Sequence, residues 1–463
     1  MEKVIKTGDL LDLTIQGLGH AGEGVGRYEN LAVFVPGVLP GERARVRIAL
    51  VKKSFARGEV VDILEQAPNR VVPPCPASRR CGGCQLQHLD YQAQLDHKRA
   101  VVQAALTRLG GLEQVEVRPT LGMTDPWHYR NKIHLQVKQE GRRVKLGFYA
   151  EGTYQLAAGP GHQTCLLVDK QINQVAAALE ELINEQTVPP YDWQKKSGLL
   201  RHVMIRRGFR TGEIMVVLVT SSQRWPAARK FAEAIVARHP EVVSVIRNIN
   251  TNPVRVVLGA ENRLLTGREY IFDYLKDLKF KISAASFYQV NPLQTEVLYN
   301  RVLQLADLKG NETVVDAYCG IGTIANFLAR HAGRVIGMEI VPDAVADARE
   351  NALLNGLANT KFIPGSVESL LPNMVAQGLK PDLVVLDPPR KGCAKEVLQA
   401  ISKAQAPRVV YVSCDPGTLA RDLGILDASG YQTLLAQQVD MFPWTSHVET
   451  IIMMTKCGSE DKK

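Results

Sequence analysis

A cysteine at position 414 stands where a buried strand must give way to a turn. The apolar run at 409–412 predicts a parallel strand, and the sequence SCDPG at 413–417 cannot continue it, because proline lacks an N–H and glycine favours a sharp turn. We expect Thr418 to cap the helix that follows. Open α/β sheets place their chemistry at the carboxyl ends of strands, so Cys414 is either a nucleophile or a buried structural thiol.

Three further cysteines lie close together in a loop rich in proline and glycine. Cys75, Cys81 and Cys84 have the spacing C-x5-C-x2-C, and Cys165 offers a distant fourth thiol. Structural zinc sites usually take their ligands in two pairs, whereas four thiolates can hold a cubane iron–sulfur cluster. The three-plus-one arrangement therefore predicts a [4Fe-4S] cluster on these four residues, with zinc or no metal as the alternatives.

A glycine turn after a strand, DAYCGIG at 316–322, predicts a small-molecule site. Glycine lets the backbone approach a ligand closely, and Glu339 is placed at the end of the next strand, where a carboxylate can accept hydrogen bonds from ribose hydroxyls. The turn has only G-x-G and carries an acid before it, which is the pattern of S-adenosylmethionine-dependent methyltransferases. A Rossmann oxidoreductase or another nucleotide binder with a degenerate loop is the alternative.

The sequence DPPR at 387–390 closes another apolar strand. An acid followed by two prolines makes a rigid lip at the strand end, because proline fixes its own φ and restricts the residue before it. We expect Asp387 to face the cofactor or a planar base there. The alternative is a plain turn, which would use the same prolines.

Length and patterning predict three domains, since 463 residues at about 150 residues per domain gives that number. Short alternating strands separated by glycine and proline turns over residues 1–63 predict a small OB-like β-barrel. Residues 64–275 carry the cysteine cluster and predict a central α+β domain. Strands and helices alternate over residues 276–463, which predicts a doubly wound, Rossmann-like α/β domain.

The formal charge of +9 is unevenly distributed along the chain. Residues 276–463 contain 19 Lys and Arg against 20 Asp and Glu, so the whole excess of positive charge lies on residues 1–275. A basic front half favours a polyanionic partner such as nucleic acid, with ordinary surface charge as the alternative. No apolar run is long enough to cross a bilayer and the start of the chain has no apolar leader, so we expect a cytoplasmic protein without a membrane partner.

Several of these motifs together resemble the RNA uracil-5-methyltransferases. The resemblance rests on FYQVN at 287–291, DAYCGIG, DPPR, SCDP at 413–416 and HVET at 447–450, and it covers essentially the whole chain. The amino-terminal barrel looks like the TRAM module of that family, and the cysteine spacing resembles the iron–sulfur ligands of its ribosomal RNA members. The resemblance implies a monomeric enzyme that methylates 23S ribosomal RNA. A transfer-RNA methyltransferase and a non-catalytic RNA-binding assembly factor are the alternatives.

The resemblance also implies roles for particular residues. Cys414 would add to carbon 6 of the target uracil, and Glu449 would remove the proton from carbon 5 after methyl transfer. Because only the thiolate attacks, we expect an electropositive setting for Cys414. Residues that match cofactor-contacting positions for S-adenosylmethionine are Gln289, Tyr318, Glu339 and Asp387.

Overall fold

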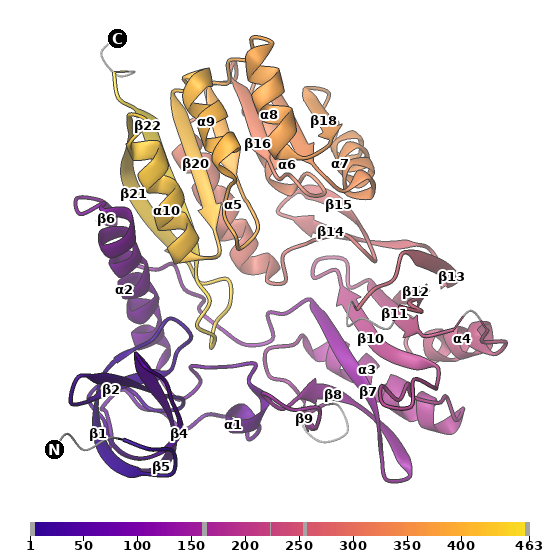
Figure 1. The fold of residues 1–463 in the computed structure, drawn as a ribbon. Helices are drawn as coiled ribbons and strands as arrows, with labels where there is room; N and C mark the ends of the chain where they lie inside the picture. Colours follow the sequence, from indigo (N-terminus) through magenta and orange to yellow (C-terminus); the bar gives the residue numbers. More distant parts are fainter. Residues whose placement is uncertain (1–4, 160–163, 223, 253–256, 459–463) are drawn as a thin grey trace.

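A computed structural model of the chain describes residues 5–159, 164–222, 224–252 and 257–458. It has an N-terminal barrel, a central sheet and a larger C-terminal sheet (Figure 1). This arrangement confirms the small barrel and the methyltransferase-like α/β domain of the predicted fold. No helix in the described part of the chain combines the length and the apolar character that crossing a membrane requires.

The barrel is closed, with the strand order β1-β2-β3-β5-β4. Alternate residues point inward along its strands, as in β4, where Ala44, Val46 and Ile48 are buried and the arginines between them are exposed. Closure leaves no unpaired sheet edge. The strands are β1 (Leu10–Leu18), β2 (Gly24–Tyr28), β3 (Leu31–Val35), β4 (Arg43–Val51) and β5 (Phe55–Glu65).

The central sheet has seven strands in the order β13-β12-β11-β10-β7-β8-β9. Helices α3 (Lys170–Glu185) and α4 (Ala228–Arg238) bury their apolar faces against one side of it. The short helix α1 (Ser78–Cys81) lies near the β9 edge. The strands are β7 (Lys132–Glu140), β8 (Arg143–Tyr149), β9 (Leu156–Ala158), β10 (Leu200–Arg207), β11 (Ile214–Thr220), β12 (Val242–Ile249) and β13 (Glu261–Gly267).

The C-terminal sheet has eight strands in the order β18-β17-β16-β19-β20-β22-β21-β6. Its first five strands are parallel, and β22 joins them in the antiparallel direction. The strands are β6 (Glu116–Val117), β16 (Thr313–Ala317), β17 (Arg334–Glu339), β18 (Thr360–Pro364), β19 (Leu383–Leu386), β20 (Arg408–Ser413), β21 (Tyr431–Val439) and β22 (Glu449–Lys456).

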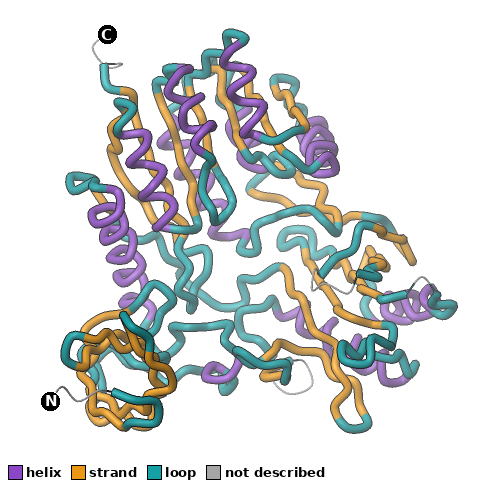
Figure 2. Tube along the Cα trace, viewed as in Figure 1, coloured by secondary structure: helices purple, strands orange, loops and turns teal. Residues whose placement is uncertain are grey.

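Helices cover both faces of the C-terminal sheet (Figure 2). Its central strands are buried on both sides, so that Val314 packs in one core and its neighbour Val315 in the other. Helices α5 (Pro292–Ala306), α6 (Thr323–Ala329) and α7 (Pro342–Leu354) pack in the first core together with the hairpin β14 (Tyr270–Leu275) and β15 (Leu278–Ser283). The second core contains α8 (Val367–Ala376), α9 (Lys395–Ala404) and α10 (Pro416–Asp427).

One segment assigned to the central domain lies elsewhere. Helix α2 (Tyr91–Gly110) packs against α10, and β6 pairs in parallel with β21. The stretch 91–117 therefore completes the C-terminal sheet and its second core, although it precedes the central domain in sequence. The predicted boundaries at 63 and 275 missed this, because hydrophobic periodicity identifies a helix but not the surface that buries it.

Candidate active site

Cys414 and Glu449 leave two neighbouring strands at the same edge of the C-terminal sheet. Strands β20 and β22 pair antiparallel, with Ser413 opposite Thr450. Cys414 follows Ser413 and Glu449 precedes Thr450. Continuing the same antiparallel register by one residue therefore places Cys414 opposite Glu449. Side chains opposite each other in such a ladder have Cβ atoms about 5 Å apart. The thiol and the carboxyl are therefore neighbours.

Asp387 ends the adjacent parallel strand. Strand β19 pairs with β20 on one side and with β16 on the other, and the Asp387 N–H donates to the carbonyl of Ala317 at 3.4 Å. Asp387 thus lies between the Cys414–Glu449 pair and the glycine turn that follows β16. It lines a cavity with residues from that turn, from α5 and α6, and from the FYQVN segment. The other lining residues are Phe287, Tyr299, Asp316, Tyr318, Cys319, Gly320, Ile321, Thr323 and Ile324.

The glycine turn brings Tyr318 to this cavity and contacts Glu339 at the end of β17. Tyr318 has φ +68°, in the left-handed region, where a residue with a side chain is strained. Its ring lines the cavity, and its hydroxyl donates to Glu368 Oε1 at 3.3 Å. Glu339 is held at the end of β17, because its carboxylate accepts from the N–H of Gly320 at 3.1 Å and of Val341 at 2.8 Å. The remaining lone pairs of Glu339 are free to accept ribose hydroxyls.

Gln289 occupies a different kind of position. Its side chain is 8% exposed and is not among those that line the cavity. Its backbone carbonyl accepts a hydrogen bond from Asn131 Nδ2 at 3.0 Å, which ties this segment to the central domain. Phe287, two residues earlier, is 66% exposed and does line the cavity. The aromatic at the start of FYQVN is therefore the member of this motif nearest the opening.

The electrostatic setting of Cys414 combines burial with charges of both signs. Burial raises the pKa of its thiol to about 11, with further increases from the charges of Glu449 and Asp387, while Arg390 acts in the opposite direction. Burial also raises the pKa of Asp387 to about 7 and that of Glu449 well above its usual range. Arg390 is a cation of the expected kind, but burial and two carboxyls oppose its effect, so the electropositive setting stays a prediction.

The helix that follows Cys414 is also capped differently. Helix α10 begins at Pro416, and the side chain of Asp415 accepts from the N–H groups of Gly417 and Thr418, both at 2.9 Å. Asp415 is thus the N-cap that was expected of Thr418, which instead donates its hydroxyl to the carbonyl of Arg390 at 3.0 Å. This bond fixes the DPPR turn against the start of α10.

Comparison with protein families identifies this arrangement. The model of the tRNA (Uracil-5-)-methyltransferase family matches residues 90–457, and that of the TRAM domain matches residues 6–61. The chain belongs to the tRNA (uracil-5-)-methyltransferase family. The sequence resemblance to RNA uracil-5-methyltransferases with a TRAM module is therefore confirmed.

Relatives of the family extend over the whole chain. An uncharacterized RNA methyltransferase of Halalkalibacterium halodurans is 45% identical over 450 residues, which cover 97% of this chain and 98% of the relative. One from Clostridium tetani is 45% identical over 458 residues, covering 99% of each. The solved tRNA (uracil-54, C5)-methyltransferase of Pyrococcus abyssi, in complex with S-adenosyl-L-homocysteine, has a TM-score of 0.77 at 27% identity, covering 96% of this chain and all of that one. The protein is thus an S-adenosylmethionine-dependent RNA methyltransferase of the uracil-5 family.

The four cysteines outside the methyltransferase site are brought near one another. Cys84 and Cys165 pack on the same aromatic cluster, which contains Trp444, and burial and the neighbouring Cys165 raise the pKa of Cys84 to about 12. Burial and, to a smaller extent, the neighbouring Cys75 raise the pKa of Cys81. Within the described ranges, however, no group of three His, Cys, Asp or Glu side chains is arranged to hold a metal ion. The four thiols therefore lie near one another, but the predicted iron–sulfur site is not confirmed.

Several functional groups were not identified from the sequence motifs. Asp316 is fully buried in the wall of the cavity, where burial and the charge of Asp387 raise its pKa well above its usual range. The charge of Arg390 lowers the pKa of Cys414. The Nη2 atom of Arg390 lies 3.4 Å from Nε2 of His447. The motifs DAYCGIG, DPPR and HVET contain all three residues, so the signal was present but their roles depend on packing.

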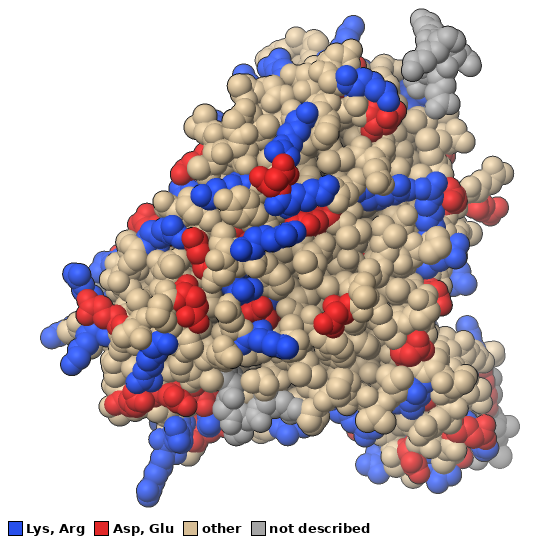
Figure 3. All heavy atoms as spheres, turned by 180° about the vertical axis from the view of Figure 1, so that it is seen from behind, with Lys and Arg blue, Asp and Glu red and all other residues tan. Residues whose placement is uncertain are grey.

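Basic side chains also lie close together on the central sheet. Lys132 on β7 is the cross-strand partner of Arg206 on β10. Burial and the charges of Arg206 and Arg130 lower the pKa of Lys132 to about 7, so positive charge outweighs negative charge there. The rear face drawn in Figure 3 instead shows acidic and basic side chains interspersed. The excess positive charge is therefore not spread evenly over that face.

Proposed function

We propose that this protein methylates carbon 5 of uridine in RNA through a covalent adduct on Cys414, and that its substrate is 23S ribosomal RNA. The observation that carries the proposal is the cross-strand placement of Cys414 beside Glu449, next to the cavity lined by the DAYCGIG turn. A nucleophile and a base on adjacent strands can act on the two neighbouring carbons of one pyrimidine ring.

Cys414 acts first in this scheme. Its sulfur bonds to carbon 6 of the uracil while the S–H proton passes to solvent water. The electron pair of the C5–C6 double bond moves into an enolate that makes carbon 5 nucleophilic. Because the pKa of the free thiol is about 11, proton loss must accompany the attack. Arg390 lowers that pKa and is the group that favours the thiolate and the enolate charge.

Glu449 completes the reaction. S-adenosylmethionine, when bound, supplies the electrophilic methyl group for carbon 5. The Glu449 carboxylate then removes the carbon 5 proton, the C–H electron pair restores the C5–C6 double bond, and the C6–S bond breaks with its electrons returning to Cys414. A carboxyl that is 5% exposed and has a raised pKa is a stronger base, once ionised, than a carboxylate in water.

The residues around the cavity fit the donor. Glu339, oriented by two backbone N–H groups, would bind the ribose hydroxyls, and Tyr318 would contact the donor from the glycine turn. Asp387 would face the methyl-transfer region between donor and base. Gln289, which the sequence resemblance also matches to the donor, is buried two residues from the cavity-lining Phe287. The S-adenosyl-L-homocysteine bound in the Pyrococcus abyssi structure supports a donor site of this type.

RNA would lie across the three domains. The target uridine must leave its stack, because carbons 5 and 6 are hidden in paired RNA, and flipping costs a few kcal/mol. The barrel, whose strand β4 exposes Arg43, Arg45 and Arg47, would supply attraction to the phosphates beside the target uridine. Salt should therefore weaken RNA binding steeply without changing the affinity for the methyl donor.

The choice between RNA substrates rests on two observations. The barrel together with the four cysteines favours 23S ribosomal RNA, following the sequence resemblance. Transfer RNA is the second candidate, since the Pyrococcus abyssi enzyme aligned along 96% of this chain acts on uracil 54 of tRNA. Incubation with methyl-labelled S-adenosylmethionine and either transcript separates them. Label at carbon 5 of uridine in 23S RNA supports the proposal, label only in tRNA replaces it, and no label in any RNA refutes it.

We further propose that Cys75, Cys81, Cys84 and Cys165 hold a [4Fe-4S] cluster that orders the central domain. Thiolates are the ligands such clusters take, and mutual repulsion among neighbouring, half-buried thiolates favours binding of a cation. Protein purified without oxygen should be brown and should contain iron and sulfide in equal amounts. Colourless protein with one bound zinc would favour the zinc alternative, and metal-free folded protein would refute both.

A further inference from the structure

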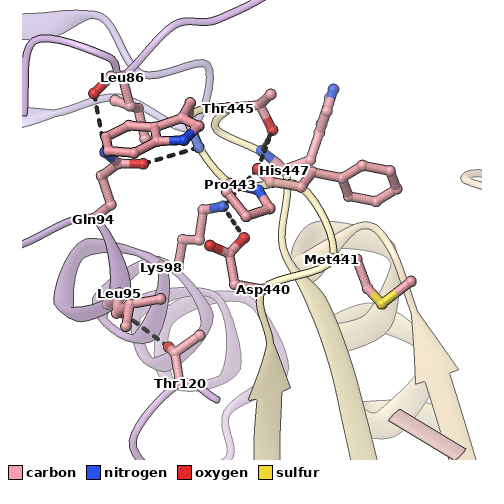
Figure 4. Close-up of polar contacts among 12 residues, drawn as sticks. Leu86, Gln94, Leu95, Lys98, Thr120, Asp440, Met441, Pro443, Thr445 and His447 are labelled. Carbon is pink, nitrogen blue, oxygen red and sulfur yellow. Dashed lines mark hydrogen bonds and ion pairs between the residues drawn. The ribbon is translucent and has the colours of Figure 1, made fainter. Parts of the chain in front are cut away.

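The segment 440–448 joins β21 to β22 and ends at Glu449, and a buried ion pair fixes its start. Lys98 Nζ lies 2.5 Å from Asp440 Oδ1, and the two side chains are 1% and 0% exposed. Lys98 also donates to the carbonyl of Phe442 at 3.1 Å, and the Tyr91 hydroxyl donates to Asp440 Oδ2 at 2.9 Å. Figure 4 shows Lys98 reaching from α2 to this segment.

The other half of α2 contacts the helix that follows Cys414. Val102 and Leu106 of α2 share a core with Leu419 of α10. Near the end of α2, a Cβ on Gly110 would lie 3.1 Å from the carbonyl oxygen of Ala420, so the two helices approach closely there. A single helix thus contacts both the segment before Glu449 and the helix after Cys414.

A stabilising role alone does not account for the ion pair. Burying a lysine and an aspartate removes both from water, and apolar residues of similar volume usually serve stability as well or better. What the charged pair adds is geometry, because its bonds have defined directions and lengths. The bonds of Lys98 to Asp440 and to Phe442 determine where the chain enters the segment that leads to Glu449.

We propose that Lys98 is a positioning residue, which holds the segment 440–448 against α2 so that the Glu449 carboxylate meets the carbon 5 proton of a base bonded to Cys414. This inference rests on the proposed function. It concerns only the last step, in which the C5–H bond breaks and the C6–S bond releases Cys414. Formation of the adduct and methyl transfer do not use Glu449, so they should not depend on Lys98.

Lys98→Met tests this separation, because methionine keeps the volume and removes the ammonium. RNA containing 5-fluorouridine traps the methylated adduct, since fluorine at carbon 5 cannot leave as a proton. We expect adduct formation within about twofold of the wild type, while turnover on uridine RNA falls about tenfold or more and the covalent intermediate accumulates. Equal losses in both measurements, or unchanged turnover, would overturn the proposal.

Two further variants keep the test decisive. The double variant Lys98→Met/Asp440→Leu removes both charges, so any folding defect of Lys98→Met should be relieved while turnover stays low. Recovery of turnover in the double variant would show that the pair only stabilises the fold. If Lys98→Met does not fold, Tyr91→Phe removes one hydrogen bond to Asp440 and should cause a smaller accumulation of the same intermediate. An unchanged intermediate level in Tyr91→Phe would then contradict the role.

A matched control comes from the central domain. Lys145 and Glu180 form an ion pair at 2.9 Å, with side chains 17% and 7% exposed, away from the active site. Lys145→Met should lower stability without changing the ratio of adduct formation to turnover. If the wild type itself forms no adduct, the proposed function fails. If the wild type turns over normally and the Lys98 variants do not accumulate the covalent intermediate, this inference alone fails.

Discussion

Ser413 of β20 is paired with Thr450 of β22, and this one pairing places Cys414 beside Glu449. The two residues are 35 positions apart in the chain, and antiparallel addition of β22 to a parallel sheet brings them together. Because the side-chain period of a strand is two, a register shift of one residue would turn Glu449 to the opposite face. The chemistry of the site therefore depends on sheet register as much as on residue type.

Replacing the proposed nucleophile should stop the reaction. Cys414→Ala removes the only atom that can bond to carbon 6 in the proposed mechanism, so turnover and the 5-fluorouridine adduct should both fall to background. The measurement is gel-shifted covalent complex together with methyl incorporation into RNA. Cys457→Ala, which changes an exposed thiol at the end of β22, is the matched control and should leave both unchanged. Residual adduct in Cys414→Ala would remove Cys414 from its role.

Glu449→Gln should separate the two halves of the reaction. The amide keeps the shape of the side chain but cannot accept the carbon 5 proton, so uridine RNA should become methylated and remain bonded to Cys414. Denaturing gels should show a stable protein–RNA complex, with multiple turnover reduced by about a hundredfold or more. Glu396→Gln on the exposed surface of α9 serves as the control. Normal turnover in Glu449→Gln would exclude it as the base.

Alkylation should follow the pKa of Cys414. Since the thiol has a pKa of about 11, its reactive thiolate is scarce at neutral pH and becomes more abundant as the pH rises. The rate of iodoacetamide labelling at Cys414 should increase about tenfold per pH unit between pH 7 and pH 9. Mass spectrometry of the peptide that contains Cys414 gives this rate separately from the other thiols. A rate that is flat over this range would show that the thiol is already ionised.

Arg390→Gln should slow adduct formation. Arg390 is the group that lowers the pKa of Cys414, so its removal raises that pKa further and leaves less thiolate at a given pH. One unit of pKa corresponds to about a tenfold loss in the ionised fraction, and we expect a decrease of this order in the rate of 5-fluorouridine trapping. The loss should stay near tenfold up to about pH 10 and shrink only as the pH rises above the wild-type pKa of about 11. Lys391→Gln, the exposed neighbouring cation, is expected to change RNA binding only.

Local patterns were sufficient for the elements themselves. The apolar run at 409–412 predicted a strand, and β20 spans Arg408–Ser413. The sequence SCDPG was expected to end that strand, and α10 begins within it at Pro416. Capping was less certain, because Asp415 and Thr418 are both good caps and only the observed backbone shows which one accepts the N–H groups.

The sequence by itself determined the types of residue and the strand ends on which they lie: a thiol after β20, acids after β17 and β19, and a glycine turn after β16. These follow from short-range patterns, since strand ends and turns depend on a few adjacent residues. The tertiary structure decided which of them meet. It placed Glu449 beside Cys414, brought both Asp387 and Arg390 close enough to act on the thiol, and buried Lys98 against Asp440. Such contacts join segments far apart in the chain, and burial, which sets their charges, exists only once the whole chain has packed.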